Sequence, residues 1–327
     1  MLFIPEAQAQ SDTINNPVKD AWIEKMSDKI AVDLSVNNSY ETFKVRAPSN
    51  PILLYPNTPN NLRLNVNYDF ISLGIQFSPD FLPGNGDEEI KGETKAFQLS
   101  TALIFRHWFT DISYSKVQGY YLRNSSDFIS WTDGDAFLQF PDLNYEGISI
   151  SSGYIHNPRF SLRSLTSQTE RQLKSAGSFI PQIHMEYYAI NDESGSESIQ
   201  NSNHLKLNVG PGYAYTLVHK QRFYASLGLT AGIGYLNSRI SSRTALQDTV
   251  TRQDNLLFRW DGKAGIGYNG SKFYAGFFTN VSGTRYKQEN TTVINSETRV
   301  FYHIFFGMRF NAPEFLRKGV NKVKKLL

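Results

Sequence analysis

The residues that could act on a solute lie in segments where polar and apolar side chains alternate, so that every second residue points to the same side. The charged candidates on the polar sides are Arg259, Asp261, Lys263, Arg299, His303, Arg309, His184, Glu186 and Lys206. If these sides line one interior, the basic residues Arg259, Lys263, Arg299 and Arg309 form a constriction that passes anionic solutes. The alternative is a ladder of charges that neutralise one another and have a structural role.

Histidine and serine could also provide hydrolytic chemistry, in which a histidine activates a serine hydroxyl. The candidate bases are His184, His204 and His303, and the candidate nucleophiles are Ser178, Ser226 and Ser282. No spacing selects a pair, and the Gly-x-Ser-x-Gly sequence of lipases is absent. A lipid hydrolase would also need these groups on the lipid-facing side, whereas the predicted register turns the histidines inward. We therefore predict that the protein is not an enzyme, and keep an outer-membrane lipid-modifying hydrolase as an alternative.

Metal and cofactor sites have no support in the sequence. The six histidines stand singly, without the paired spacing of metal ligands, and the chain has no cysteine. Two glycine clusters lie within alternating segments and no helix follows them, unlike phosphate-binding loops; they are Gly228, Gly232 and Gly234, and Gly262, Gly265 and Gly267. We expect no metal and no cofactor, and interpret these glycines as places over which Tyr224 and Tyr274 pack.

The elements that carry these residues are predicted to be long strands. From residue 205 to 235 the alternation is broken only at His219-Lys220-Gln221. Strands of soluble domains are usually about half this length, and an apolar face opposite a small, polar one is typical of a barrel strand that crosses a bilayer. Twelve strands are predicted, at 29–38, 59–68, 71–81, 96–106, 109–121, 143–155, 177–190, 204–217, 222–237, 254–268, 272–284 and 297–310.

The spacers between these strands also favour a closed antiparallel transmembrane β-barrel. Short breaks such as Asp69-Phe70 and Asn269-Gly270-Ser271 alternate with long polar ones such as 122–142 and 238–253. Outer-membrane barrels have short periplasmic turns and longer outer loops. An even number of strands places both termini in the periplasm. Ten or fourteen strands are the alternatives.

Composition is compatible with this fold. The 327 residues carry a net charge of +3, too small to suggest a nucleic-acid partner. A mean hydropathy of −0.39 does not exclude a membrane barrel, because the polar lumen offsets the apolar outside. No uncharged apolar run approaches the roughly 18 residues of a spanning helix.

The chain divides into four predicted parts. Residues 1–10 are interpreted as the remnant of a secretory signal, since Ala7-Gln8-Ala9 has the small-x-small pattern of a cleavage site. A periplasmic segment with a helical turn near Trp22 covers 11–28, the barrel covers 29–310, and 311–327 is a basic tail that forms a short helix or a disordered end. Residues 156–176 do not fit a short turn and are predicted to be a plug or turn insertion, with plug candidates Arg163, Glu170, Arg171 and Gln172.

Several short motifs of the chain resemble a family known only as domain of unknown function 4421. They are Val18-Lys19-Asp20, Asp28 to Val32, Leu54-Tyr55-Pro56-Asn57, Leu62 to Tyr68, Asn157 to Arg163, Gln168, Glu170-Arg171-Gln172 and Ser175 to Phe179. The resemblance spans nearly all of the mature chain. It implies an outer-membrane β-barrel of Bacteroides-type, Gram-negative bacteria, and it implies no activity.

The sequence therefore predicts an all-β outer-membrane barrel in contact with outer-membrane lipid, most simply a monomer. Its expected role is a narrow channel or transport barrel for small, anionic solutes. A soluble lipocalin-like ligand-binding β-barrel is a further alternative, in which the bulky face of 205–235 would be the core and the small face would meet water.

Overall fold

The computed structural model describes residues 21–38, 42–45, 50–194, 199–243, 248–287 and 294–324. Twelve strands form a ring of antiparallel pairs, which is closed by pairing of the last strand with the first. In ring order they are β2 (Lys29–Asn37), β5 (Asn61–Tyr68), β6 (Ile71–Phe77), β7 (Lys95–Ile104), β8 (Trp108–Leu122), β9 (Gln139–Tyr154), β12 (Gln182–Asp192), β13 (Ile199–Gly210), β15 (Phe223–Arg243), β16 (Asp248–Asn269), β17 (Phe273–Lys287) and β18 (Ile294–Asn311). The predicted transmembrane β-barrel with twelve strands is confirmed, and the counts of ten and fourteen are not.

Two of the predicted strands are interrupted near proline. The strand predicted at 204–217 is β13 followed by β14 (Gly212–His219), and both pair with β15. The strand predicted at 177–190 is β11 (Ala176–Phe179) followed by β12, which pair with β14 and β13. Pro181 and Pro211 stand at these two interruptions, because proline has no N–H to donate to a strand ladder.

The outer face of the ring is apolar. Along β15 the side chains of Leu227, Leu229 and Ile233 are 67%, 58% and 71% exposed, and comparable residues follow the outside of the other strands. A monomeric soluble protein rarely exposes a contiguous apolar surface of this extent. The arrangement matches a barrel whose outside contacts lipid and whose inside is polar. No helix in the described ranges has the length and apolar character needed to cross a membrane.

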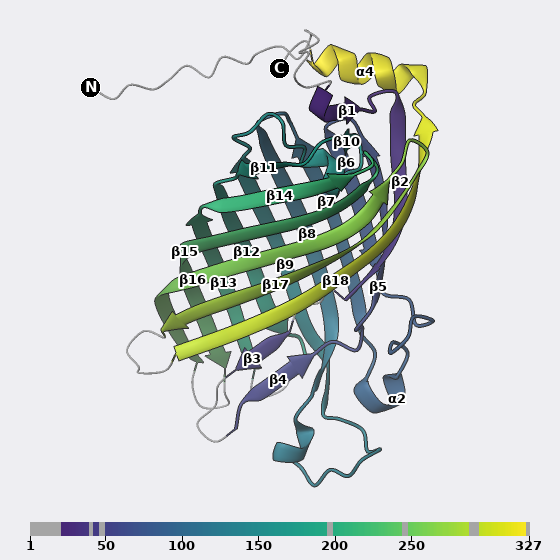
Figure 1. The fold of residues 1–327 in the computed structure, drawn as a ribbon. Coiled ribbons are helices and arrows are strands. Elements are labelled where there is room, and N and C mark those ends of the chain that lie inside the picture. Colours follow the sequence, from purple (N-terminus) through teal and green to yellow (C-terminus); the bar gives the residue numbers. More distant parts are fainter. Residues whose placement is uncertain are drawn as a thin grey trace, which may run out of the picture.

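The two ends of the ring differ (Figure 1). At the end that we name the short-turn end, tight turns join β5 to β6 and β14 to β15, with positive φ at Asp69, Lys220 and Gln221. The opposite end, named the long-loop end, carries β3 (Phe43–Val45), β4 (Ile52–Tyr55), α2 (Glu88–Lys91) and the 3-10 turn η1 (Ser125–Asp127). β4 extends the barrel wall by pairing with β8.

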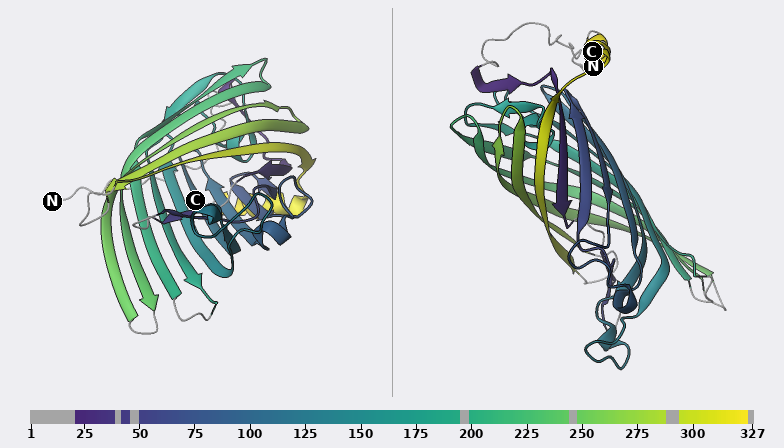
Figure 2. Two further views of the ribbon diagram at one scale, coloured as in Figure 1. Left: turned by 90° about the horizontal axis from the view of Figure 1, so that it is seen from below. Right: turned by 90° about the vertical axis from the view of Figure 1, so that its right-hand side faces the viewer.

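The segment 156–176 lies at the short-turn end. It contains α3 (Arg163–Thr166) and β10 (Glu170–Gln172), and β10 pairs with β1 (Ile23–Lys25). The prediction of a helical turn around Trp22 to Met26 is therefore wrong over 23–25, where pairing with the insertion extends the chain. The tail forms the helix α4 (Glu314–Lys324), which lies across the same end (Figures 1 and 2).

Candidate functional site

The candidate site is the wall of the lumen, the space enclosed by the ring. On each strand the register decides which side chains face it. On β12, Gln182, His184 and Glu186 pair with Gly210, Asn208 and Lys206 of β13, and all of these stand on the inner side. On β16 the inward set includes Arg259, Asp261 and Lys263, as predicted from the alternation.

The described lumen carries charges of both signs. Its basic side chains include Arg63, Lys206, Arg259 and Lys263, and its acidic ones include Asp33, Asp111, Glu186 and Asp261. Asp33, Arg63 and Asp111 are not among the site residues predicted from the sequence. The same alternation identifies them: Asp33 stands between Val32 and Leu34, Arg63 between Leu62 and Leu64, and Asp111 between Thr110 and Ile112.

Several of these charges already have protein partners. Asp33 accepts hydrogen bonds from Asn65 at 2.7 Å and from the Tyr274 hydroxyl at 3.1 Å. Arg259 donates to both oxygens of Asp261, at 2.9 and 3.0 Å. This favours the self-neutralising alternative for the Arg259–Asp261 pair.

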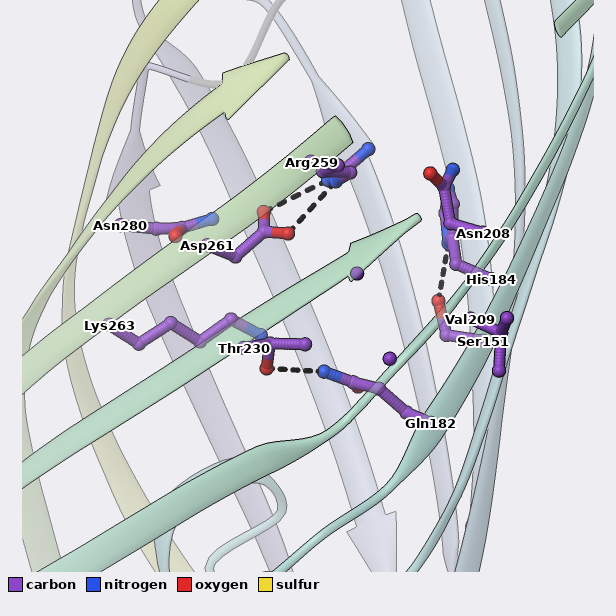
Figure 3. A pocket seen from close by; sticks show the side chains of 12 residues that line it. Ser151, Gln182, His184, Asn208, Val209, Thr230, Arg259, Asp261, Lys263 and Asn280 are labelled. Carbon is purple, nitrogen blue, oxygen red and sulfur yellow. Dashed lines mark hydrogen bonds and ion pairs between the residues drawn. The ribbon is translucent and has the colours of Figure 1, made fainter. Parts of the chain in front are cut away.

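A pocket of about 160 Å³ lies in this wall. Its lining consists of Ser151, Gln182, His184, Asn208, Val209, Gly210, Thr230, Gly232, Arg259, Asp261, Lys263 and Asn280. Figure 3 shows Arg259, Asp261 and Lys263 of β16 on one side and His184, Asn208 and Gln182 of β12 and β13 on the other. The Ser151 hydroxyl and His184 Nδ1 are 2.8 Å apart, and Gln182 donates to Thr230 at 2.5 Å.

A second polar group stands outside the pocket lining on β12 and β13. Lys206 Nζ lies 3.1 Å from Glu186 Oε2 and 4.6 Å from the ring centre of Tyr188. Tyr188 stacks on His204, with the ring centres 4.6 Å apart. Glu186 and Lys206 are thus inward, as predicted, and bind each other.

The prediction that Arg309 belongs to a constriction with Arg259 and Lys263 is wrong. Arg309 stands near the end of β18 and is 4% exposed. It donates to the Gln168 carbonyl at 2.9 and 2.6 Å, to Asn269 Oδ1 at 2.6 Å and to the Gly270 carbonyl. It therefore binds the insertion 156–176 and the β16–β17 turn, because its strand position lies at the short-turn end.

The two other predicted residues of β18 have different outcomes. His303 faces inward and contacts Phe305 edge-on, with the ring centres 5.4 Å apart. The Arg299 side chain lies outside the residues whose side chains the structure describes.

The insertion 156–176 is anchored by a buried ion cluster. The guanidinium of Arg163 lies 3.3 Å from Asp69 and 3.4 Å from Glu170, and donates to the Ile104 carbonyl at 2.5 Å. Lys324 of α4 contacts the second oxygen of Asp69 at 2.5 Å. The cluster therefore connects the insertion, two short turns of the barrel and the C-terminal helix.

The other two plug candidates hold the insertion to itself and to β1. Arg171 donates to Glu24 of β1 at 2.7 Å. Gln172 accepts from the Ser161 amide at 2.8 Å and donates to the Arg159 carbonyl at 2.7 Å. We refer to residues 156–176 together with β1 as the plug.

Glycines in the wall receive aromatic rings. A Cβ at Gly267 would lie 2.5 Å from the Tyr224 hydroxyl, and one at Gly307 would lie 2.3 Å from Tyr274 Cζ. Tyr224 thus packs over Gly267, as the sequence suggests, while Tyr274 packs over Gly307, which lies outside the two predicted glycine clusters. Glycine at these positions leaves room for a large ring next to the backbone.

The serines predicted as nucleophiles do not pair with the candidate histidines in the hydrogen bonds of the described residues. Ser178 instead donates to the Phe179 carbonyl and accepts from the Asn157 amide. The described serine hydroxyls bonded to these histidines belong to Ser151, at His184, and to Ser202 and Ser238, at His204. Among the described residues, no cluster of three histidine or carboxylate side chains is placed to hold a metal ion.

Residues 10–310 match the family described as Domain of unknown function (DUF4421). The chain belongs to this family. No curated protein matches it.

Among solved structures, the outer membrane protease OmpT from Escherichia coli has a TM-score of 0.39 and 7% sequence identity, over 88% of this chain and 96% of that one. The unliganded ferric citrate transporter FecA has a TM-score of 0.32 and 10% identity, over 85% of this chain and 41% of that one. A Pseudomonas aeruginosa FadL homologue has a TM-score of 0.27 and 9% identity, over 91% and 93%. These identities are too low to transfer an activity to the DUF4421 protein.

Proposed function

We propose that this protein is an outer-membrane β-barrel that admits small polar solutes to its lumen, and that the plug closes the lumen at its periplasmic end. The main support for this proposal is the contrast between the two faces of the ring: Leu227 and Ile233 are largely exposed outside, while Arg259, Asp261 and Lys263 stand inside. A soluble lipocalin-like barrel would reverse this arrangement. We further propose that the protein is a monomer surrounded by lipid, and not an enzyme.

The orientation follows from the lengths of the connections. Outer-membrane barrels have short turns on the periplasmic side and long loops outside. Here the short turns share one end with α4, β1 and the insertion (Figure 1). Both described ends of the chain, and the plug, then lie on the periplasmic side.

The solute class follows from the lumen. Its described charges are of both signs and include the ion pairs Arg259–Asp261 and Lys206–Glu186, so a bare lumen of this composition has weak selectivity between anions and cations. The strong anion preference expected from four clustered basic residues is not proposed, since Arg309 serves the plug and Arg259 is bound to Asp261.

The first test is the position and closure of the barrel. A C-terminally tagged full-length protein is expressed in a Gram-negative host, and the membranes are fractionated. We expect recovery with the outer membrane, a tag that is not accessible on intact cells, and a faster band in unheated gel samples. A soluble periplasmic protein without a heat shift would refute the proposal.

The second test is conduction. In planar bilayers the wild type is expected to show rare or small openings, and a variant with a loosened plug larger or more frequent ones. Equal conductance in the two would remove the plug from the proposal. The hydrolase alternative can be tested with an ester substrate. It would be supported by hydrolysis that is lost in both Ser151→Ala and His184→Ala, whose side chains are hydrogen-bonded.

A further inference from the structure

The lumen pocket contains a buried amide whose partner is missing from the described chain. Asn208 is 7% exposed, lines the pocket, and has no hydrogen-bond partner for either Oδ1 or Nδ2 within the described ranges. A buried amide without partners is costly, about 1–3 kcal/mol for each unsatisfied group. Such a group at a pocket surface is suited to an occupant that both donates and accepts a hydrogen bond.

Two further groups of the pocket define the chemistry of that occupant. Asn280 stands beside Lys263 across the β16–β17 pair, and its buried Oδ1 also has no partner among the described residues. This oxygen can only accept, so it requires a donor such as a hydroxyl. The Lys263 ammonium lies in the electrostatic range of Asp111 and lines the same pocket, where it can bind an anionic group.

The part of the wall between Asn208 and Arg259 has no side chains that project into the pocket, because it consists of glycine on β15. Gly232 lies opposite Arg259, and Gly234 lies opposite Asn208. A Cβ at Gly234 would lie 2.2 Å from Asn208 Oδ1, so any larger residue there would displace the amide. The glycines thus keep open the space between Asn208 of β13 and Arg259 of β16.

We propose that this pocket is a binding site for a small hydroxylated carboxylate, of the size of a single sugar acid. The carboxylate binds Lys263, with the adjacent Arg259–Asp261 pair at the edge. Its hydroxyl groups bind Asn280 and both atoms of the Asn208 amide. The pocket of about 160 Å³ is smaller than the roughly 300–1,000 Å³ of drug-sized sites, which excludes larger solutes. This inference rests on the proposed function and names the solute class of the lumen.

The test uses the full-length protein in detergent, with the folded barrel verified by its heat shift. D-glucuronate and D-gluconate are titrated by calorimetry, and D-glucose and inorganic phosphate serve as probes that lack the carboxylate or the hydroxyl groups. We expect saturable binding of at least one sugar acid, and at least about tenfold weaker binding of glucose and of phosphate, because a hydrogen bond to a charged group contributes about 1.5–3 kcal/mol.

Variants separate the pocket from the rest of the lumen. Lys263→Gln and Asn208→Ala are each expected to weaken sugar-acid binding about tenfold or more. Lys206→Gln is the matched control: it removes the same charge from the same lumen at a position outside the pocket lining, and should change the affinity less than about threefold. The heat shift of each variant reports whether it is folded.

Several results would overturn the site. They are no saturable binding of either acid by the folded wild type, equal binding by Lys263→Gln, or tighter binding of glucose or phosphate. These outcomes differ from failure of the proposed function. A folded outer-membrane barrel that binds no sugar acid refutes the site alone, while a protein that is soluble or shows no heat shift refutes the barrel proposal itself.

Discussion

Removal of the Arg163 side chain should open the plug. Arg163 is the buried cation shared by Asp69 and Glu170, at 3.3 and 3.4 Å, and it also holds the Ile104 carbonyl of the barrel. Loss of one partner from a buried ion pair costs about 3–5 kcal/mol, because the remaining charge is left uncompensated. Since each 1.4 kcal/mol is a factor of ten, Arg163→Met should favour the undocked plug by about 10² to 10⁴-fold.

The assay is single-channel recording in planar bilayers, together with amide hydrogen exchange over residues 156–176. Arg163→Met should open more often or to a larger conductance, and exchange in α3 and β10 should become faster. Arg171→Met is the matched control, with the same substitution in the same insertion. Its partner Glu24 is 41% exposed, and a pair of this kind contributes only about 0–1 kcal/mol.

A second variant distinguishes the ion cluster from general damage. In Arg163→Met/Glu170→Gln the uncompensated carboxylate is removed, while Asp69 keeps Lys324 as its partner. Closure should be restored in large part. The reasoning is refuted if Arg163→Met, with a normal heat shift, keeps wild-type conductance and wild-type exchange in 156–176, or if Arg171→Met has the same effect.

Three other predictions follow from the same structure. Leu229→Arg places a charge on the lipid face and should destabilise the inserted barrel by about 2–4 kcal/mol, whereas Thr230→Arg, its pocket-lining neighbour, should retain the heat-shifted band; equal loss of the folded band in both would contradict the assigned faces. Gly307→Val should prevent folding, since a Cβ would lie 2.3 Å from Tyr274 Cζ, while Gly319→Ala in α4, where nothing lies within 4 Å, should be neutral or slightly stabilising in a denaturant titration. Lys263→Gln removes a positive charge from the lumen and should shift the reversal potential of the open channel toward cation selectivity. If Lys206→Gln produces this shift and Lys263→Gln does not, Lys263 does not control the ion selectivity.

The strands and the face that each residue occupies are predictable from the sequence, since both depend on a period of two. Residues 223–235 show this clearly: Leu227, Leu229 and Ile233 face lipid, while Ser226, Thr230 and Gly232 do not. The same rule assigns Arg259 and Lys263 to the lumen, and applied to β2, β5 and β8 it also assigns Asp33, Arg63 and Asp111.

The period gives the face of a residue and not its level along the barrel axis, which explains the error at Arg309. Arg259 and Arg309 both point inward, but Arg259 stands in the middle of β16 and Arg309 two residues from the end of β18. A count of residues from the nearest short turn would have separated them. The hydrogen-bond partners of Arg309 cannot be predicted from residue types, because most are backbone carbonyls, at Gln168 and Gly270, that any residue could supply. A sequence pattern does not indicate such acceptors. The ion pair between Arg163 and Asp69 is also hard to predict, because the two residues are 94 positions apart in the sequence. The lumen wall therefore follows from local alternation, while the plug depends on contacts between residues that are far apart in the sequence.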